Sequence, residues 1–221
     1  MKRTLFSLLF TVICLSTLQA QELSYPKANR WGWGIVAGLN KSYPVFITGL
    51  PLHVNPNYSP TLGVDVNYRI NNRSTLHIQP QWAQLNSAGS NGWYGPIYSI
   101  TSVKLPVLYR YYLLPGKQSL FVEGGLSFNQ IVESNYQEQQ MVFCFAGPCP
   151  ILYSQNLAPI TTSAVSGIAG IGLNLNLHKI SIPVSFRYER SLTNYAFPKY
   201  YDAPPTPLRL ENIGFITGVN F

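Results

Sequence analysis

The stretch 62–70 reads LGVDVNYRI and decides the fold, because its side chains alternate between two kinds without interruption. Its even positions are Leu, Val, Val, Tyr and Ile, whereas its odd positions are Gly, Asp, Asn and Arg. Successive side chains of a β-strand point to opposite faces, so the stretch predicts a strand with one apolar and one polar face.

Seven more segments have the same phase, at about 33–41, 75–85, 101–113, 118–130, 162–177, 179–190 and 210–221. Their apolar faces carry no charge. The charged residues all fall on the polar faces: Asp65, Arg69, Lys104, Arg110, Glu123, Arg187 and Glu189. A Lys or Arg that faces lipid at the middle of a bilayer costs about 2–4 kcal/mol. We therefore expect the apolar faces to meet lipid and these charges to form a network inside a barrel.

The connections between these segments alternate in length. Short links at 71–73, 115–117 and 178–179 alternate with long ones at 42–60, 86–100, 131–161 and 191–209. Outer-membrane barrels have tight periplasmic turns and long external loops. The pattern predicts an all-β, eight-stranded, antiparallel up-and-down transmembrane β-barrel with both ends of the mature chain in the periplasm.

Composition favours the same class. Charged residues make up 10% and aromatic residues 14% of the chain, whereas soluble proteins usually carry about 25% charge. No basic run of five or more residues occurs, so nucleic acid is not an expected partner. Aromatic residues gather where the strands are expected to enter and leave the membrane. They are Trp33, Tyr68, Tyr109, Tyr111 and Phe221 at one rim, and Trp82, Phe128 and Tyr188 at the other.

The first twenty residues have the pattern of a cleaved signal peptide. Lys2 and Arg3 precede an apolar run over 5–18, and the run is followed by Leu-Gln-Ala at 18–20. Cleavage is expected before Gln21, which leaves 21–221 as a single outer-membrane barrel domain. The apolar run is shorter than the roughly 20 residues that span a bilayer, which favours removal over anchoring.

The mature chain keeps two cysteines, Cys144 and Cys149, which predict a disulfide in an exported protein. A metal site is the less favoured alternative, because no His or acidic residue lies near them. They lie in an apolar stretch of the longest link, for which we expect either a partner-binding tip or a plug over the barrel mouth. Its candidate contact residues are Met141, Phe143, Phe145, Ile151 and Tyr153.

The prolines and glycines inside the strands lead to two further predictions. Pro80, Pro106 and Pro183 each remove a donor from the ladder, and they predict β-bulges. The small inward residues of two strands are expected to make room for long charged side chains; they are Gly170, Gly172, Gly214 and Gly218.

No catalytic, metal-binding or cofactor-binding pattern is apparent. The three histidines, His53, His77 and His178, fall in a long link, on a polar strand face and in a short turn. We therefore expect a non-enzymatic protein that is structural or displays loops to a partner. Two alternatives stay open: a secreted lipocalin-like barrel that binds an apolar ligand, and a small-solute channel. An interior of eight strands is about wide enough to be filled by side chains, which disfavours an open channel.

Four segments carry a resemblance to a known family: the Ala20-Gln21 junction, SVKLPVLYRYY at 102–112, LFVEGGL at 120–126 and IGFITGVNF at 213–221. With these the chain resembles the PorT-like outer-membrane β-barrel proteins of Bacteroidetes-type bacteria. The resemblance implies contact with outer-membrane lipid and lipopolysaccharide, and no catalytic residues. The tail with Phe215 and Phe221 looks like the signal that the barrel-assembly machinery reads. Some relatives are linked to secretion or gliding machinery, so another surface or secretion-machinery protein is a possible partner.

Overall fold

Residues 31–221 form one compact unit. The computed structural model describes residues 30–46, 55–88, 97–114, 118–137, 139–140, 152–153, 159–177, 180–197 and 206–221. Its strands are β1 (Trp31–Phe46), β2 (Asn55–Pro56), β3 (Tyr58–Asn71), β4 (Ser74–Ile78), β5 (Gln81–Ala88), β6 (Ile97–Tyr112), β7 (Gln118–Gln137), β8 (Gln139–Gln140), β9 (Leu152–Tyr153), β10 (Ser163–Leu177), β11 (Ile180–Ser191), β12 (Tyr195–Phe197) and β13 (Thr206–Asn220). The predicted signal peptide lies outside the described residues.

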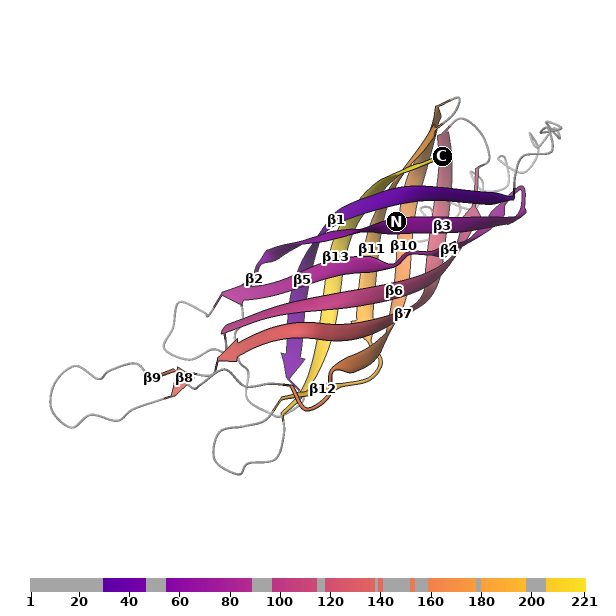
Figure 1. Cartoon of the computed structure of the whole chain (residues 1–221). Helices are drawn as coiled ribbons and strands as arrows, with labels where there is room; N and C mark the ends of the chain where they lie inside the picture. The colour runs from indigo at the N-terminus through magenta and orange to yellow at the C-terminus, as the bar shows by residue number, and fades with distance from the viewer. Residues whose placement is uncertain are drawn as a thin grey trace, which may run out of the picture. The chain divides into compact units, whose positions relative to one another are not determined.

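Antiparallel pairing closes the sheet into a ring, in which strands run obliquely around a barrel (Figure 1). β1 pairs with β3 on one side and with β13 on the other, so the first and last long strands meet. The sheet contains eleven strands, but three pairs of them, β2–β3, β4–β5 and β11–β12, are interrupted halves of single strands. The barrel wall therefore has the eight strands that the sequence predicts.

Side chains alternate across this wall as expected. On β3 the residues from Tyr58 to Val66 alternate between exposed outward and buried or half-buried inward positions. Leu62 is 57% exposed, whereas Asp65 is completely buried. The polar faces thus point into the barrel and the apolar faces point away from it.

The strands are longer than predicted at the end where the long links begin, which we call the long-link end. The alternation predicts an end near residue 130 for β7, which continues to Gln137, and an end near residue 41 for β1, which continues to Phe46. Polar residues enter the outward face there, for example Lys41. Backbone pairing continues although the two-residue pattern fades, since pairing does not need an apolar outer face. The opposite end, which holds the Asn72–Arg73 turn, is called the short-turn end.

The bulges predicted at the three prolines are not present. Pro106 pairs with Ser127 and Pro183 pairs with Asn174 without a shift of register. Pro80 separates β4 from β5, yet its carbonyl accepts a bond of 3.0 Å from the Val64 amide. Each proline removes one donor and keeps its acceptor, so the loss is a single hydrogen bond, about 0.5–1.5 kcal/mol. Among the described pairings, register shifts occur instead at Arg69/Asn71 and Thr101/Ser102.

One small ladder lies within the longest link. β8 pairs with β9 through Gln139–Tyr153 and Gln140–Leu152. The predicted disulfide and the contact residues Met141, Phe143, Phe145 and Ile151 lie outside the described residues, and Tyr153 belongs to this ladder. No helix among the residues that the structure describes is long and apolar enough to cross a membrane.

Candidate functional site

Glu123 of β7 is the centre of an ionic cluster inside the barrel. It lies between two arginines, Arg110 of β6 and Arg187 of β11, and all three side chains are buried. Arg110 donates from Nη2 to Oε2 of Glu123 at 2.9 Å, and Arg187 donates from Nε to Oε1. Two guanidinium groups on one carboxylate leave a local charge of +1, so the cluster needs further negative groups nearby.

The negative charge comes from Asp65, which lies in a second cluster toward the short-turn end. His77 Nδ1 is 3.0 Å from both carboxylate oxygens of Asp65, and Gln79 donates an amide hydrogen bond to Asp65 at 3.1 Å. Gln79 also accepts from Nη1 of Arg187 at 2.9 Å. The two clusters therefore form one hydrogen-bonded network through Gln79.

A third cluster lies toward the long-link end. Lys104 and Glu189 form an ion pair of 2.7 Å, and Asn129 donates to the other oxygen of Glu189 at 3.1 Å. Tyr195 of β12 is buried above them and is hydrogen-bonded to Asn129. Tyr195 is only 2% exposed, so its side chain contributes to the packing of the interior at this end.

The buried charges of these clusters cancel. Asp65, Glu123 and Glu189 oppose Lys104, Arg110 and Arg187. Burying an unpaired charge costs several kcal/mol, so an equal number of cations and anions is the arrangement that a closed interior tolerates.

Six of the seven charges predicted for the interior are brought together, and Arg69 is not. Its side chain is exposed near the short-turn end of β3, beside the register shift at Arg69/Asn71. The prediction for Arg69 is therefore wrong, because the position lies at the open end of the barrel rather than within it.

Of the four glycines predicted to make room for charged side chains, Gly170 does so, whereas Gly214 lies against Asn40 and Gly218 against Ile35 and Val36. A Cβ on Gly170 would lie 3.1 Å from Cγ of Arg187 and 3.2 Å from Cγ of Glu123, closer than ordinary contact. Gly172 similarly makes room for the ring of Phe121, over which the Arg110 guanidinium lies at 4.0 Å. The long inward side chains of the neighbouring strands therefore occupy the space that side chains at Gly170 and Gly172 of β10 would fill.

The interior that remains is small. A cavity of about 20 Å³, enough for one water molecule, is lined by Gln81, by Arg187 of the Glu123 cluster, and by Lys104 and Glu189 of the third cluster. Side chains fill the described interior as expected for eight strands.

Thr75, His77 and Asp65 have the order of groups found in hydrolase triads. Thr75 Oγ1 lies 2.8 Å from His77 Nε2, and Asp65 holds the other ring nitrogen. Thr75 is only 7% exposed, however, and the cavity above is not lined by it. A nucleophile needs space beside it for a substrate, and this cavity does not reach the buried Thr75 hydroxyl. Among the described residues, no group of three His, Cys, Asp or Glu could hold a metal ion.

The outer wall has the opposite character. Its exposed large side chains are apolar on every long strand, and Leu126, Phe186 and Phe215 are 55%, 54% and 54% exposed. A lipocalin-like barrel needs the reverse orientation, with apolar faces inward, so the structure contradicts that alternative.

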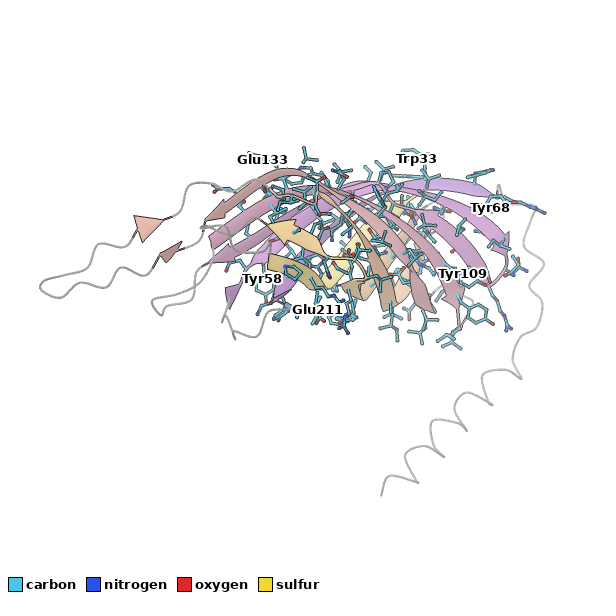
Figure 2. All side chains as sticks on the ribbon, turned by 90° about the horizontal axis from the view of Figure 1, so that it is seen from below. Trp33, Tyr58, Tyr68, Tyr109, Glu133 and Glu211 are labelled. Atoms are coloured by element: carbon cyan, nitrogen blue, oxygen red, sulfur yellow. The ribbon has the colours of Figure 1, made fainter. Side chains whose placement is uncertain are left out.

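One group of outer-wall aromatic residues lies at the short-turn end. Trp33 packs on Phe221 with ring centroids 4.8 Å apart, and Trp31 packs on Tyr68 at 4.9 Å. Figure 2 shows Trp33, Tyr68 and Tyr109 toward this end, and Tyr58, Glu133 and Glu211 toward the other. The two ring pairs join β1 to both of its neighbours, where the first and last long strands meet.

These features define a closed eight-stranded β-barrel with an ionic interior and an apolar exterior. No protein-family model matches the chain. The search of curated proteins finds no matching relative.

Solved structures of similar architecture are outer-membrane proteins. OprG from Pseudomonas aeruginosa is 9% identical with a TM-score of 0.49, covering 86% of this chain and 94% of that one. Neisserial surface protein A is 12% identical with a TM-score of 0.46, covering 89% of this chain and 100% of that one. AlkL is 12% identical with a TM-score of 0.46, covering 91% and 96%. The assignment of the barrel rests on this chain's own strand pairing.

Proposed function

We propose that this chain is a non-enzymatic integral outer-membrane β-barrel protein that is structural or displays its long links to a partner. The observation that carries the proposal is the exposed apolar wall around a charged interior. Soluble monomers rarely expose continuous apolar patches above a few hundred Å², and this wall is apolar on all eight strands. Hydrocarbon is the environment in which such a surface is stable.

The proposed orientation places the short-turn end in the periplasm and the long-link end outside the cell. Tight turns at one end and long links at the other support it. The same proposal includes a signal peptide at 1–20, cleavage before Gln21, and both mature termini in the periplasm. The resemblance of 102–112, 120–126 and 213–221 to PorT-like proteins supports membership of that group. In this proposal Phe221 and Phe215, both outward and exposed, are read by the barrel-assembly machinery.

A small-solute channel is the less supported alternative. The interior charges are paired, and the cavity among them holds about one water molecule. Passage of a solute would require these ion pairs to separate.

Membrane insertion tests the main proposal. The mature chain, refolded in the presence of phospholipid vesicles, is expected to float with the vesicles through a density gradient. It is also expected to run faster on a detergent gel before boiling than after, since closed barrels resist the detergent until heated. A chain that stays in the aqueous fraction and is fully soluble without detergent would contradict the proposal.

The link between β8 and β9 is the proposed partner-binding segment. The short ladder brings the two ends of this link together. Its partner is expected to be another surface or secretion-machinery protein. Deleting 141–151 should abolish capture of that partner from solubilised outer membrane while barrel insertion is kept, and unchanged capture would remove this part of the proposal.

A further inference from the structure

The outer wall changes from apolar to charged within one or two outward positions along three neighbouring strands. Leu39 of β1 and the outward residues Phe215 and Ile213 of β13 are exposed and apolar. Toward the long-link end they are followed by four charged residues: Lys41 of β1, Glu211 and Arg209 of β13, and Arg190 of β11. We call the surface formed by these four residues with Tyr43 and Tyr58 the basic-tyrosine patch.

Lys41 lies between two exposed tyrosine rings. Its Nζ is 5.7 Å from the centroid of Tyr43 and 5.6 Å from that of Tyr58, and Tyr58 is 71% exposed. No carboxylate of the described residues forms an ion pair with Lys41. The ammonium group is therefore held by aromatic faces, which leaves its hydrogens available to an anion.

The remaining charges of the patch leave it positive. Arg190 Nε pairs with Glu211 at 3.3 Å, so the one carboxylate is already neutralised. Arg209 donates to the amide oxygen of Asn194 at 2.8 Å, a neutral partner. Register places Tyr43 opposite Glu211 and Val45 opposite Arg209, so these groups lie in adjacent rows of the wall. Three cations against one carboxylate give a net charge of +2.

The patch lies at the height of lipid headgroups. Lys41 follows Trp31, which lies in the aromatic cluster of the other end, by ten residues on β1. At about 3.3 Å per residue and a tilt of about 40°, this distance spans roughly 25 Å of membrane, the height of the apolar band of such barrels. Lys41 is thus at the first level where a phosphate could be met.

We propose that the basic-tyrosine patch binds the phosphate of a glycolipid of the outer leaflet, of the lipid A type. The inference rests on the proposed function, because only insertion with the long links outward places the patch in that leaflet. Lys41 and Arg209 contact the phosphate, Arg190 and Glu211 keep the row in place, and the Tyr43 and Tyr58 rings cover the sugar and the start of the acyl chains. Aromatic rings are suited to this boundary because they have an apolar body and a polar tip.

Binding to lipid A in a bilayer of neutral lipid tests the inference. The refolded protein in phosphatidylcholine nanodiscs is titrated with bisphosphorylated lipid A, and bound lipid is counted by native mass spectrometry. Lys41→Gln should weaken the apparent affinity about fivefold to tenfold, and Lys41→Gln with Arg209→Gln should weaken it further. Arg73→Gln is the matched control, since Arg73 is an exposed cation in the turn at the short-turn end. The Arg73→Gln variant should bind lipid A with the same affinity as the unmodified protein.

Two further arms identify the ligand. The unmodified protein and the Lys41→Gln variant should bind dephosphorylated lipid A with the same affinity. The unmodified protein should bind phosphatidylglycerol more weakly than it binds lipid A. Equal affinity of the Lys41→Gln, Arg73→Gln and unmodified proteins for lipid A would overturn the inference, as would equal binding of phosphatidylglycerol. Both results require a protein that inserts, so they leave the proposed function standing. Failure of the unmodified chain to enter the nanodisc would overturn both.

Discussion

Replacing Glu123 by Gln is expected to lower the free energy of unfolding by about 3–5 kcal/mol. The change keeps the size of the side chain and removes its charge, so Arg110 and Arg187 lose their shared counterion. Removing one partner of a buried ion pair is strongly destabilising because it leaves the other charge buried and uncompensated. Here two guanidinium groups are left, which makes Glu123 the most sensitive position of the interior.

Urea unfolding in lipid vesicles, followed by tryptophan fluorescence, measures this effect. Glu133→Gln is the matched control, because Glu133 lies on the same strand with an exposed side chain, and it should change stability by less than about 0.5 kcal/mol. Adding Arg187→Met to Glu123→Gln should cost less than the sum of the two single changes, since it removes one uncompensated charge. If Glu123→Gln is as mild as Glu133→Gln, the interior is hydrated rather than closed.

Replacing Ile171 by Arg is expected to cost about 2–4 kcal/mol of stability in a bilayer. Ile171 lies near the middle of β10, points outward and is 50% exposed. An arginine there faces the centre of the hydrocarbon layer, where its charge cannot be hydrated. In a water-soluble barrel the same substitution on an exposed surface would be nearly neutral.

Leu177→Arg is the matched comparison. Leu177 is on the same strand and is 53% exposed, but it lies at the short-turn end. Arginine costs about 0–1 kcal/mol near the interface, because its side chain reaches the headgroups. Both variants are refolded into vesicles and unfolded with urea. Equal stability of the two would show that the outer wall does not lie across an apolar layer.

The fold could be predicted from the sequence largely because lipid and interior impose opposite requirements on alternate residues. In 62–70 this contrast is complete, whereas in 118–130 the inward Phe121 is apolar; in both stretches the strand is confirmed. The ends of strands could not be predicted in the same way. Beyond Lys41 and Gln130, both faces accept polar residues, so the pattern stops while backbone pairing continues to Phe46 and Gln137.

The interior network could be predicted in its members but not in its pairing. The two-residue alternation predicts inward faces for Glu123 and Arg187. Their contact, however, joins residues 64 positions apart in the sequence and depends on how the strands come together in the barrel. The inward phase of His77 and Gln79 predicts no role for them, although Gln79 links two clusters. Tyr195 had no signal, because it belongs to a short strand within a long link. The prediction of bulges at the prolines is wrong because the carbonyls of Pro80 and Pro106 still accept ladder hydrogen bonds.

Spin labels placed one at a time at the outward positions 165, 167, 169, 171, 173, 175 and 177 of β10 test the central claim most directly. These positions avoid Gly170 and Gly172, beside which the interior has no room for a side chain. The labels are attached to single cysteines in a chain whose Cys144 and Cys149 are replaced by Ser, and the protein is inserted in vesicles. The ratio of collisions with oxygen, which dissolves in lipid, to collisions with a water-soluble nickel complex should be highest at 169 and 171 and should fall toward both ends of the strand. A ratio that is the same at all seven positions would contradict an apolar wall that lies across a lipid layer.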